Sequence, residues 1–126
     1  MRQGGARWHS DSGGDLLSLV ERERSRWQRY HISSCLVLFD LSKATRPDKM
    51  ERALFRGLSR RVRAADSIGR LGEERIGLLL PATGLNGAGK VVRDVLGSWR
   101  REEFPRCTVQ CYPEKDAVVL EELPAE

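Results

Sequence analysis

The sequence predicts a single α+β domain with a ferredoxin-like βαββαβ order, in which an antiparallel sheet carries helices on one face and follows an N-terminal lead-in helix. Its 126 residues fit one hydrophobic core. Short apolar runs at residues 36–39 and 76–80 have the length of strands. Longer charged segments repeat apolar residues every three or four positions, which is typical of amphipathic helices.

The first third of the chain predicts a tail, a helix and a strand. Residues 1–13 are rich in glycine and polar side chains, so we expect a flexible tail without fixed structure. A lead-in helix is expected over residues 15–30, with Asp15 as its N-cap. Residues 33–41 are apolar and too short for a helix, which predicts a buried strand ending at Asp40.

The rest of the chain completes the order. Pro47 suits a first helical turn, and the helix it opens repeats apolar residues in steps of four at Met50, Leu54, Leu58 and Val62. We expect a hairpin around Gly72, then a second long helix on the same face, and four or five antiparallel strands in all. Strands are expected at residues 67–71, 74–80, 106–112 and 117–120, and residues 84–89 should form a loop into a helix whose apolar face runs from Ala88 to Trp99. The domain should span residues 14–120, and the acidic residues 121–126 should form a tail or the start of a linker.

Cysteine usage and apolar run lengths predict the compartment. Cys35, Cys107 and Cys111 include no Cys-x-x-Cys pair, which argues against a zinc site and against a disulfide framework. We therefore expect reduced thiols in a cytoplasmic protein. Cys107 and Cys111, four residues apart on one strand, are too far apart to bond to each other. No run approaches the roughly 20 apolar residues of a membrane span, so no membrane insertion is expected.

The net charge of +4 permits a polyanionic partner. However, the sequence lacks the aromatic interleaving and zinc-ligand spacing of nucleic-acid modules, which argues against a nucleic-acid partner. The basic residues recur at helical spacing between residues 49 and 63, at Lys49, Arg52, Arg56, Arg60 and Arg63. The plainer interpretation of this stripe is a solvated helix face.

One segment carries a family resemblance. Residues 63–81 read Arg63-Ala-Ala-Asp66-Ser-Ile-Gly-Arg-Leu-Gly72-Glu-Glu-Arg-Ile-Gly-Leu-Leu-Leu-Pro81. This run resembles, without a gap, the part of GGDEF domains that extends from the inhibitory Arg-x-x-Asp motif through the signature hairpin. The helix ending at Arg29-Tyr30 and the strand ending at Asp40 are also similar to that family. The resemblance covers about residues 16 to 112 and implies the diguanylate cyclase fold.

The departures from the family pattern concern its chemistry. Within the signature only Gly72 is retained, and the substitutions that follow it are Glu73, Glu74, Arg75 and Ile76. In the family, the second glycine lets the backbone approach GTP and the acids hold magnesium, so the resemblance implies a degenerate site. Asp40 matches the first metal-binding aspartate, whereas the second acid is replaced by Ser42. Hence we expect no catalytic residue, no metal and no cofactor, and regard Asp40 and residues 72–75 as remnants.

Three functions follow from the resemblance. The favoured one is a catalytically inactive regulatory or interaction domain with a protein partner or a second copy as its target. The alternative is a cyclic di-GMP receptor in which Arg63, Asp66 and Arg93 bind the ligand, since an arginine fork suits guanine O6 and N7 and a carboxylate suits N1–H and N2–H. A purely local role for Arg63 and Asp66, at a helix end and a turn, competes with it. An active diguanylate cyclase is disfavoured.

The strand at residues 107–113 adds a further expectation about context. Its sequence resembles domains that precede bacterial exopolysaccharide sugar transferases. This resemblance implies a partner in bacterial signalling or exopolysaccharide synthesis, although the sequence contains no transferase motif.

Overall fold

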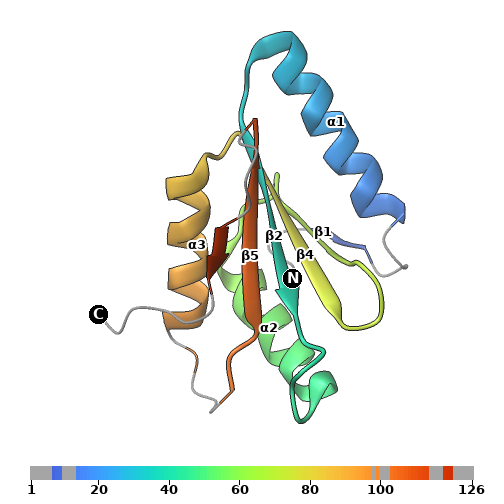
Figure 1. The fold of residues 1–126 in the computed structure, drawn as a ribbon, viewed down its shortest axis with the longest axis vertical. Helices are drawn as coiled ribbons and strands as arrows, with labels where there is room; N and C mark the ends of the chain where they lie inside the picture. Colours follow the sequence, from blue (N-terminus) through green and yellow to red (C-terminus); the bar gives the residue numbers. More distant parts are fainter. Residues whose placement is uncertain (1–6, 10–13, 98, 100–102, 114–117, 121–126) are drawn as a thin grey trace.

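The computed structural model describes residues 7–9, 14–97, 99, 103–113 and 118–120 (Figure 1). Three helices and six strands alternate along this part of the chain. In chain order the elements are β1 (Arg7–His9), α1 (Gly14–Tyr30), β2 (Ser34–Asp40), α2 (Pro47–Arg61), β3 (Ser67–Arg70), β4 (Arg75–Pro81), α3 (Leu85–Gly97), β5 (Arg106–Tyr112) and β6 (Val118–Leu120).

The strands form one sheet in the order β1-β3-β4-β2-β5-β6. Strand β2 lies at its centre and pairs antiparallel with β4 on one side and β5 on the other. Strands β3 and β4 form the predicted hairpin, and β6 extends the sheet beyond β5. The predicted ferredoxin-like βαββαβ fold is confirmed.

Strand β1 is an addition that the sequence did not predict. Arg7–His9 pairs with β3 in parallel, whereas every other pairing in the sheet is antiparallel. The prediction that residues 1–13 lack fixed structure is wrong for these three residues, because the edge of β3 offers them backbone hydrogen-bond partners. Residues 1–6 and 10–13 lie outside the described part of the chain.

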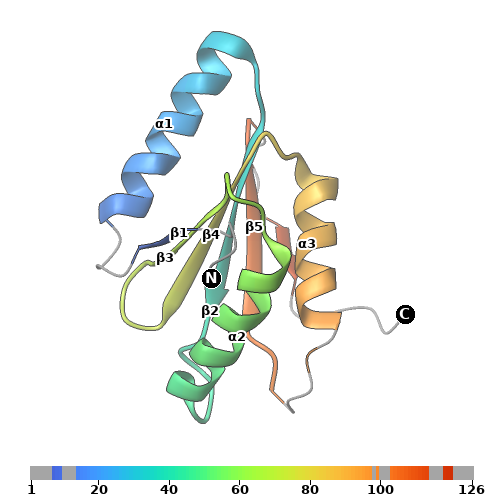
Figure 2. The ribbon, with the colours of Figure 1, turned by 180° about the vertical axis from the view of Figure 1, so that it is seen from behind.

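The helices cover both faces of the sheet. The two connecting helices α2 and α3 contact each other on one face, as predicted, and Figure 2 shows them side by side. The lead-in helix α1 contacts β2, β3 and β4 on the opposite face. A Cβ atom at Gly77 would lie 2.6 Å from Leu16 Cδ2, so the first turn of α1 rests directly on the β4 backbone.

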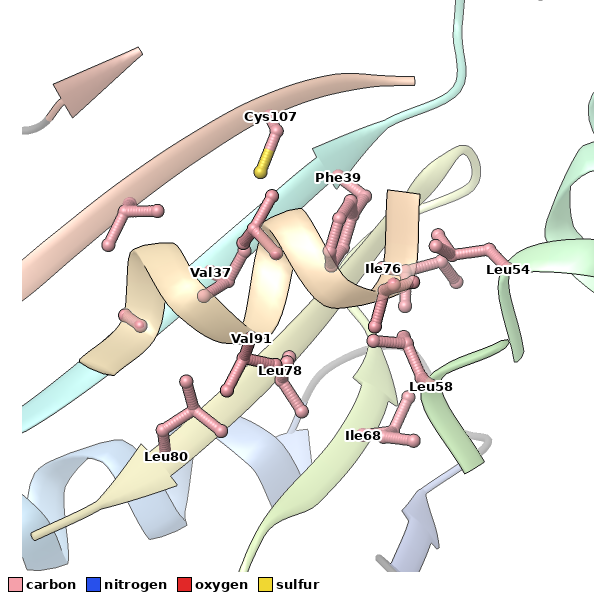
Figure 3. Close-up of a cluster of buried hydrophobic side chains, with 14 of the residues drawn as sticks. Val37, Phe39, Leu54, Leu58, Ile68, Ile76, Leu78, Leu80, Val91 and Cys107 are labelled. Atoms are coloured by element: carbon pink, nitrogen blue, oxygen red, sulfur yellow. The ribbon is translucent and has the colours of Figure 1, made fainter. Parts of the chain in front are cut away.

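The hydrophobic core lies between the sheet and the pair α2 and α3 (Figure 3). Alternate residues of β2 and β4 point into it, since successive side chains of a strand point to opposite faces. Apolar residues at steps of four on α2 and at helical spacing on α3 close it from the other side. Its members include Val37, Phe39, Leu54, Leu58, Ile68, Ile76, Leu78, Leu80, Val91 and Cys107.

Local signals account for the ends of α2. Pro47 occupies the first turn together with Asp48, where the missing proline N–H and the negative charge are both favourable. Arg60 and Arg61 lie in the last turn, and the Val62 N–H caps the Leu58 carbonyl oxygen at 3.0 Å. In the described part of the chain no helix is long and apolar enough to cross a membrane.

The cysteine prediction was wrong for two of the three residues. Cys35 lies directly opposite Cys111 in the register of β2 against β5, and the two form a disulfide. Spacing along the chain argued against a disulfide framework and excluded the pair Cys107 and Cys111, but it could not reveal a partner across the sheet. Cys107 is free and buried, and desolvation raises its pKa to about 12.

A buried carboxylate on α1 gives a stability prediction. The Glu23 side chain is 1% exposed; its Oε2 faces the Arg22 and Arg26 guanidinium groups at 3.7 and 3.4 Å, but its Oε1 has no hydrogen-bond partner. Replacing this carboxylate in Glu23→Met removes a desolvation cost and leaves two arginines that are already solvated. We expect the free energy of unfolding in urea to rise by about 1 kcal/mol.

Glu21 provides the matched control for this substitution. It also faces an arginine at 3.4 Å on α1, but its side chain is 70% exposed. Glu21→Met should therefore leave the urea midpoint nearly unchanged. A fall in stability that is larger for Glu23→Met than for Glu21→Met would contradict the prediction.

Candidate functional site

The β3–β4 hairpin carries the residues that the sequence resemblance aligns with the family signature. Residues 71–74 form its turn, in which the Leu71 N–H donates to the Arg75 carbonyl oxygen at 2.8 Å. Gly72 has φ +97°, a conformation that glycine adopts without strain and that other residues rarely adopt. Glu73 beside it is exposed. The Glu74 carbonyl oxygen accepts the Leu41 N–H at 2.7 Å and so joins the turn to the end of β2.

Asp40, at the end of β2, lies between two arginines. It is directly opposite Arg75 on β4 and Arg106 on β5, and directly opposed residues share a sheet face with Cβ atoms about 5 Å apart. The Ser42 N–H donates to Asp40 Oδ1 at 2.9 Å. This backbone bond is the main reason that the pKa of Asp40 is lowered; the Ser42 side chain and the charges of Arg75 and Arg106 lower it further, against desolvation.

The donor set around Asp40 does not fit a magnesium ion. Mg²⁺ requires an octahedron of hard oxygen ligands. Here guanidinium groups stand on both neighbouring strands, and one Asp40 oxygen is engaged by the Ser42 backbone. Among the described residues, no three His, Cys, Asp or Glu side chains gather closely enough to hold a metal ion.

A small cavity adjoins Asp40. Its volume is about 260 Å³, which is below the range of about 300–1,000 Å³ that is typical of small-molecule pockets. The acid on its far side, Glu103, accepts hydrogen bonds from the Thr45 N–H at 3.0 and 3.2 Å. Hydrogen bonds from the Thr45 side chain and backbone lower the Glu103 pKa, so this carboxylate is also engaged locally. The lining residues are Asp40, Lys43, Ala44, Met50, Glu103, Phe104 and Arg106.

The predicted pair Arg63 and Asp66 is brought together at the opposite end of the sheet. The Asp66 side chain is 1% exposed, and its Oδ2 accepts the Arg63 backbone N–H at 2.7 Å. Arg63 Nη2 donates to Asp66 Oδ1 at 2.9 Å, and to Pro81 O and Thr83 Oγ1 at 3.1 Å each. Arg63 Nε also donates to Asp66 Oδ2 at 3.5 Å, and the Arg63 side chain as a whole is 54% exposed.

Arg93 does not join this pair. Arg93 is exposed on α3, next to Asp94. The pKa of Asp94 is lowered mainly by the hydrogen bond that Arg61 Nε donates to it at 2.7 Å, and the charge of Arg93 lowers it further. In the described part of the chain no hydrogen bond or ion pair links Arg93 to Arg63 or Asp66. The structure thus assembles two of the three predicted ligand-binding residues.

Sequence reasoning missed two partners and one cavity. Arg106 as a neighbour of Asp40 follows from strand register, and Thr83 as a partner of Arg63 follows from a contact with the loop after β4; no motif indicates either. A larger cavity, of about 530 Å³, lies between α1 and the sheet. Its lining includes Val20, Arg24, Leu36, Leu79, Gln110 and Tyr112. These residues are scattered along the sequence, so no motif indicated the cavity.

Comparisons with known proteins bear on the fold. No protein-family model and no curated protein matches the sequence. A solved structure of a DGC protein from Thermotoga maritima is similar, with a TM-score of 0.70 and 16% identity over 89% of this chain and 87% of that one. The diguanylate cyclase SiaD of Pseudomonas aeruginosa, solved with its activator SiaC, has a TM-score of 0.60 and 26% identity over 77% of this chain.

The second of these structures is much longer than this chain, which covers 44% of it. At these identities the likeness establishes the fold rather than the chemistry. The chain has a GGDEF-like fold, and the resemblance drawn from residues 63–81 is confirmed at that level.

Proposed function

Starting from the GGDEF-like fold, we propose that this chain is a catalytically inactive domain that acts as a regulatory or interaction module. The row Arg75, Asp40 and Arg106 supports this proposal most directly. The position at which the resembling family places an acid beside the metal is Arg75, and Arg106 places a second cation on the other side of Asp40.

Electrostatics explains why this row is incompatible with the cyclase reaction. Arg75 and Arg106, whose Cβ atoms lie about 5 Å from that of Asp40, place two positive charges beside its carboxylate, and these charges repel a divalent cation there. Ser42 supplies no carboxylate, and Asp40 already accepts its backbone N–H. Without the metal, no ion at this place would bridge the phosphate oxygens or activate the attacking hydroxyl, and Arg75 lacks the oxygen needed to accept a proton.

We expect the purified protein, incubated with GTP and Mg²⁺, to form no cyclic di-GMP above a boiled control when the products are measured by mass spectrometry. An active diguanylate cyclase assayed in parallel confirms that the conditions support the reaction. The variant Asp40→Asn, purified identically, controls for contaminating enzymes. Product formed by the wild type and lost in Asp40→Asn would refute the proposal.

The partner in this proposal is another protein. The SiaD structure shows a diguanylate cyclase bound to an activator protein, which supports protein binding as a use of this fold. The resemblance of residues 107–113 extends the proposal to partners in bacterial signalling or exopolysaccharide synthesis. The disulfide between Cys35 and Cys111 weighs against a reducing compartment, because such bonds persist mainly in oxidising ones.

A cyclic di-GMP receptor is the second candidate, and the half-exposed Arg63 guanidinium favours it. Contacts to Asp66, Pro81 and Thr83 hold that group in one orientation at the surface, which lowers the entropic cost of binding. Both protons of Nη2 are engaged in these contacts, however, and Asp66 is buried. Guanine recognition by both residues therefore requires the pair to open.

A further inference from the structure

The outer face of α2 carries four cations in a line: Lys49, Arg52, Arg56 and Arg60, here called the basic row. All four are exposed, and they follow one another at steps of three, four and four residues. The row therefore extends about 16 Å along the helix, with one cation in each turn. It lies opposite the buried positions Met50, Leu54 and Leu58, so it faces away from the core.

The basic row differs from the arginines of the domain that pair with acids, because none of its four cations forms an ion pair with a described carboxylate. Elsewhere in the described part of the chain, six arginines pair with acids: Arg22, Arg24, Arg26, Arg61, Arg63 and Arg70. No residue that the structure describes forms an ion pair with any member of the basic row. Helix α2 contains two acids: Glu51 is directed to Arg70 on β3, and Asp48, next to Lys49 in the first turn, forms no ion pair with the row among the described residues.

Such an arrangement is unfavourable for the isolated helix. Like charges four residues apart, as in Arg52 with Arg56 and Arg56 with Arg60, destabilise a helix. The chain contains 18 acidic residues, so its composition would allow the signs to be interspersed on this face. An uncompensated single-sign row is what a surface needs if its counter-charges are supplied by another molecule.

We propose that the basic row docks the acidic face of an α-helix in a partner protein. This inference rests on the proposed role as an interaction module and names the chemistry of its partner. Carboxylates placed once per turn on a partner helix repeat at the 5.4 Å pitch of α2 itself, so four pairs can form along the row. Three of the four cations are arginines, whose planar fork binds carboxylates bidentately.

Other occupants fit less well. A second copy would set one basic row against another, which is repulsive. A membrane surface would gain only electrostatic attraction, because the apolar face of α2 is buried in the core and is not available for insertion. Single-stranded nucleic acid binds where several exposed aromatic side chains let bases stack. Between the cations of the row, α2 offers one partly exposed aromatic side chain, Phe55 at 36%, and the exposed Ser59.

The test uses a fluorescent helical peptide of about 18 residues with glutamate once per turn on one face, titrated against the whole domain by anisotropy. Four exposed ion pairs give modest affinity, so we expect a Kd on the order of 100 μM in low salt, weakening about tenfold as screening rises to 0.3 M. Arg52→Glu/Arg56→Glu/Arg60→Glu should abolish binding. A peptide with lysine in place of glutamate should not bind.

The matched control changes the same amount of charge on the opposite face of the domain. Arg22→Glu/Arg24→Glu/Arg29→Glu on α1 should reduce the peptide affinity less than threefold, provided that circular dichroism shows both triple variants folded. If the α2 triple variant does not fold, Arg56→Gln alone should weaken binding and its salt dependence, whereas Arg29→Gln should not.

Several results would overturn the inference. Equal losses of peptide affinity in the two triple variants would show that binding depends only on net charge. Tighter binding of a short oligonucleotide, or of anionic phosphatidylglycerol vesicles, than of the peptide would assign the row to another class of partner. The GTP assay described above is independent of this face, so cyclic di-GMP synthesis with intact peptide binding would refute the proposed inactivity alone. If the wild type neither binds the peptide nor makes cyclic di-GMP, the inference about the basic row is refuted and the proposed inactivity stands.

Discussion

Reduction of the Cys35–Cys111 disulfide is expected to lower the free energy of unfolding by about 4 kcal/mol. The two cysteines are 76 positions apart, and a cross-link of that span removes a large part of the conformational entropy of the unfolded chain. The bond joins neighbouring strands β2 and β5, and its reduction opens the long loop of chain that the cross-link closes.

Two features of the site set the size of this effect. Cys35 Sγ lies 3.3 Å from the Thr83 carbonyl oxygen, so the reduced thiol can donate a weak hydrogen bond there and offset a small part of the loss. Cys107 cannot replace either partner in the folded protein, because it is fully buried and a pKa of about 12 leaves almost no thiolate at neutral pH.

The measurement compares urea unfolding of the wild type with and without dithiothreitol. The double variant Cys35→Ala/Cys111→Ala should unfold at the midpoint of the reduced wild type and should be insensitive to the reductant, while Cys107→Ala should keep the full response. Alkylation of the unfolded, unreduced wild type should modify one thiol, and three after reduction. Three modified thiols without reductant would show that the bond is absent.

Most of the fold could be predicted from the sequence because the elements have strong periodic patterns. Apolar steps of four between Met50 and Val62 identified α2, and the position of Gly72 between two apolar runs identified the β3–β4 hairpin. Strand β1 could not be predicted, because its three residues carry no alternating pattern and depend on pairing with β3. The facing of Cys35 and Cys111 likewise follows only from the register of two strands far apart in the chain.

The candidate site was predicted less well, for a related reason. The sequence placed Arg75 in the signature, but that Asp40 lies between Arg75 and Arg106 depends on two strand registers together. Arg63 and Asp66 are close in sequence, so their pairing could be anticipated as a local interaction. Their contacts with Pro81 and Thr83, and the burial of Asp66, are tertiary and could not.

Asp66→Asn is expected to lower the free energy of unfolding by about 2–3 kcal/mol. Both carboxylate oxygens of the buried Asp66 are used, one by the Arg63 backbone N–H and one by its guanidinium group. An amide can accept at only one of these places, and its NH₂ group would face a donor at the other, so a charge-assisted bond is replaced by an unsatisfied buried polar contact.

Asp94→Asn is the matched control for this substitution. Asp94 also pairs with an arginine, at 2.7 Å, but its side chain is 42% exposed. We therefore expect no measurable change in urea unfolding for Asp94→Asn. If Asp66→Asn is equally silent, the interpretation of the Arg63–Asp66 pair as a structural contact is wrong.

Calorimetry with cyclic di-GMP decides whether the same pair also binds a ligand. If the domain is a receptor, the wild type should bind with micromolar affinity, and Arg63→Ala should weaken binding by about thirtyfold, equivalent to about 2 kcal/mol, because a bidentate charged contact is lost. Asp94→Asn should bind as the wild type does, and cyclic di-AMP should bind more weakly because it lacks the guanine edge. The intramolecular contacts of Arg63 Nη2 compete with guanine for the same protons. Absence of heat at about 100 μM nucleotide, together with a destabilised Asp66→Asn, would therefore show that the motif is retained for its local structure.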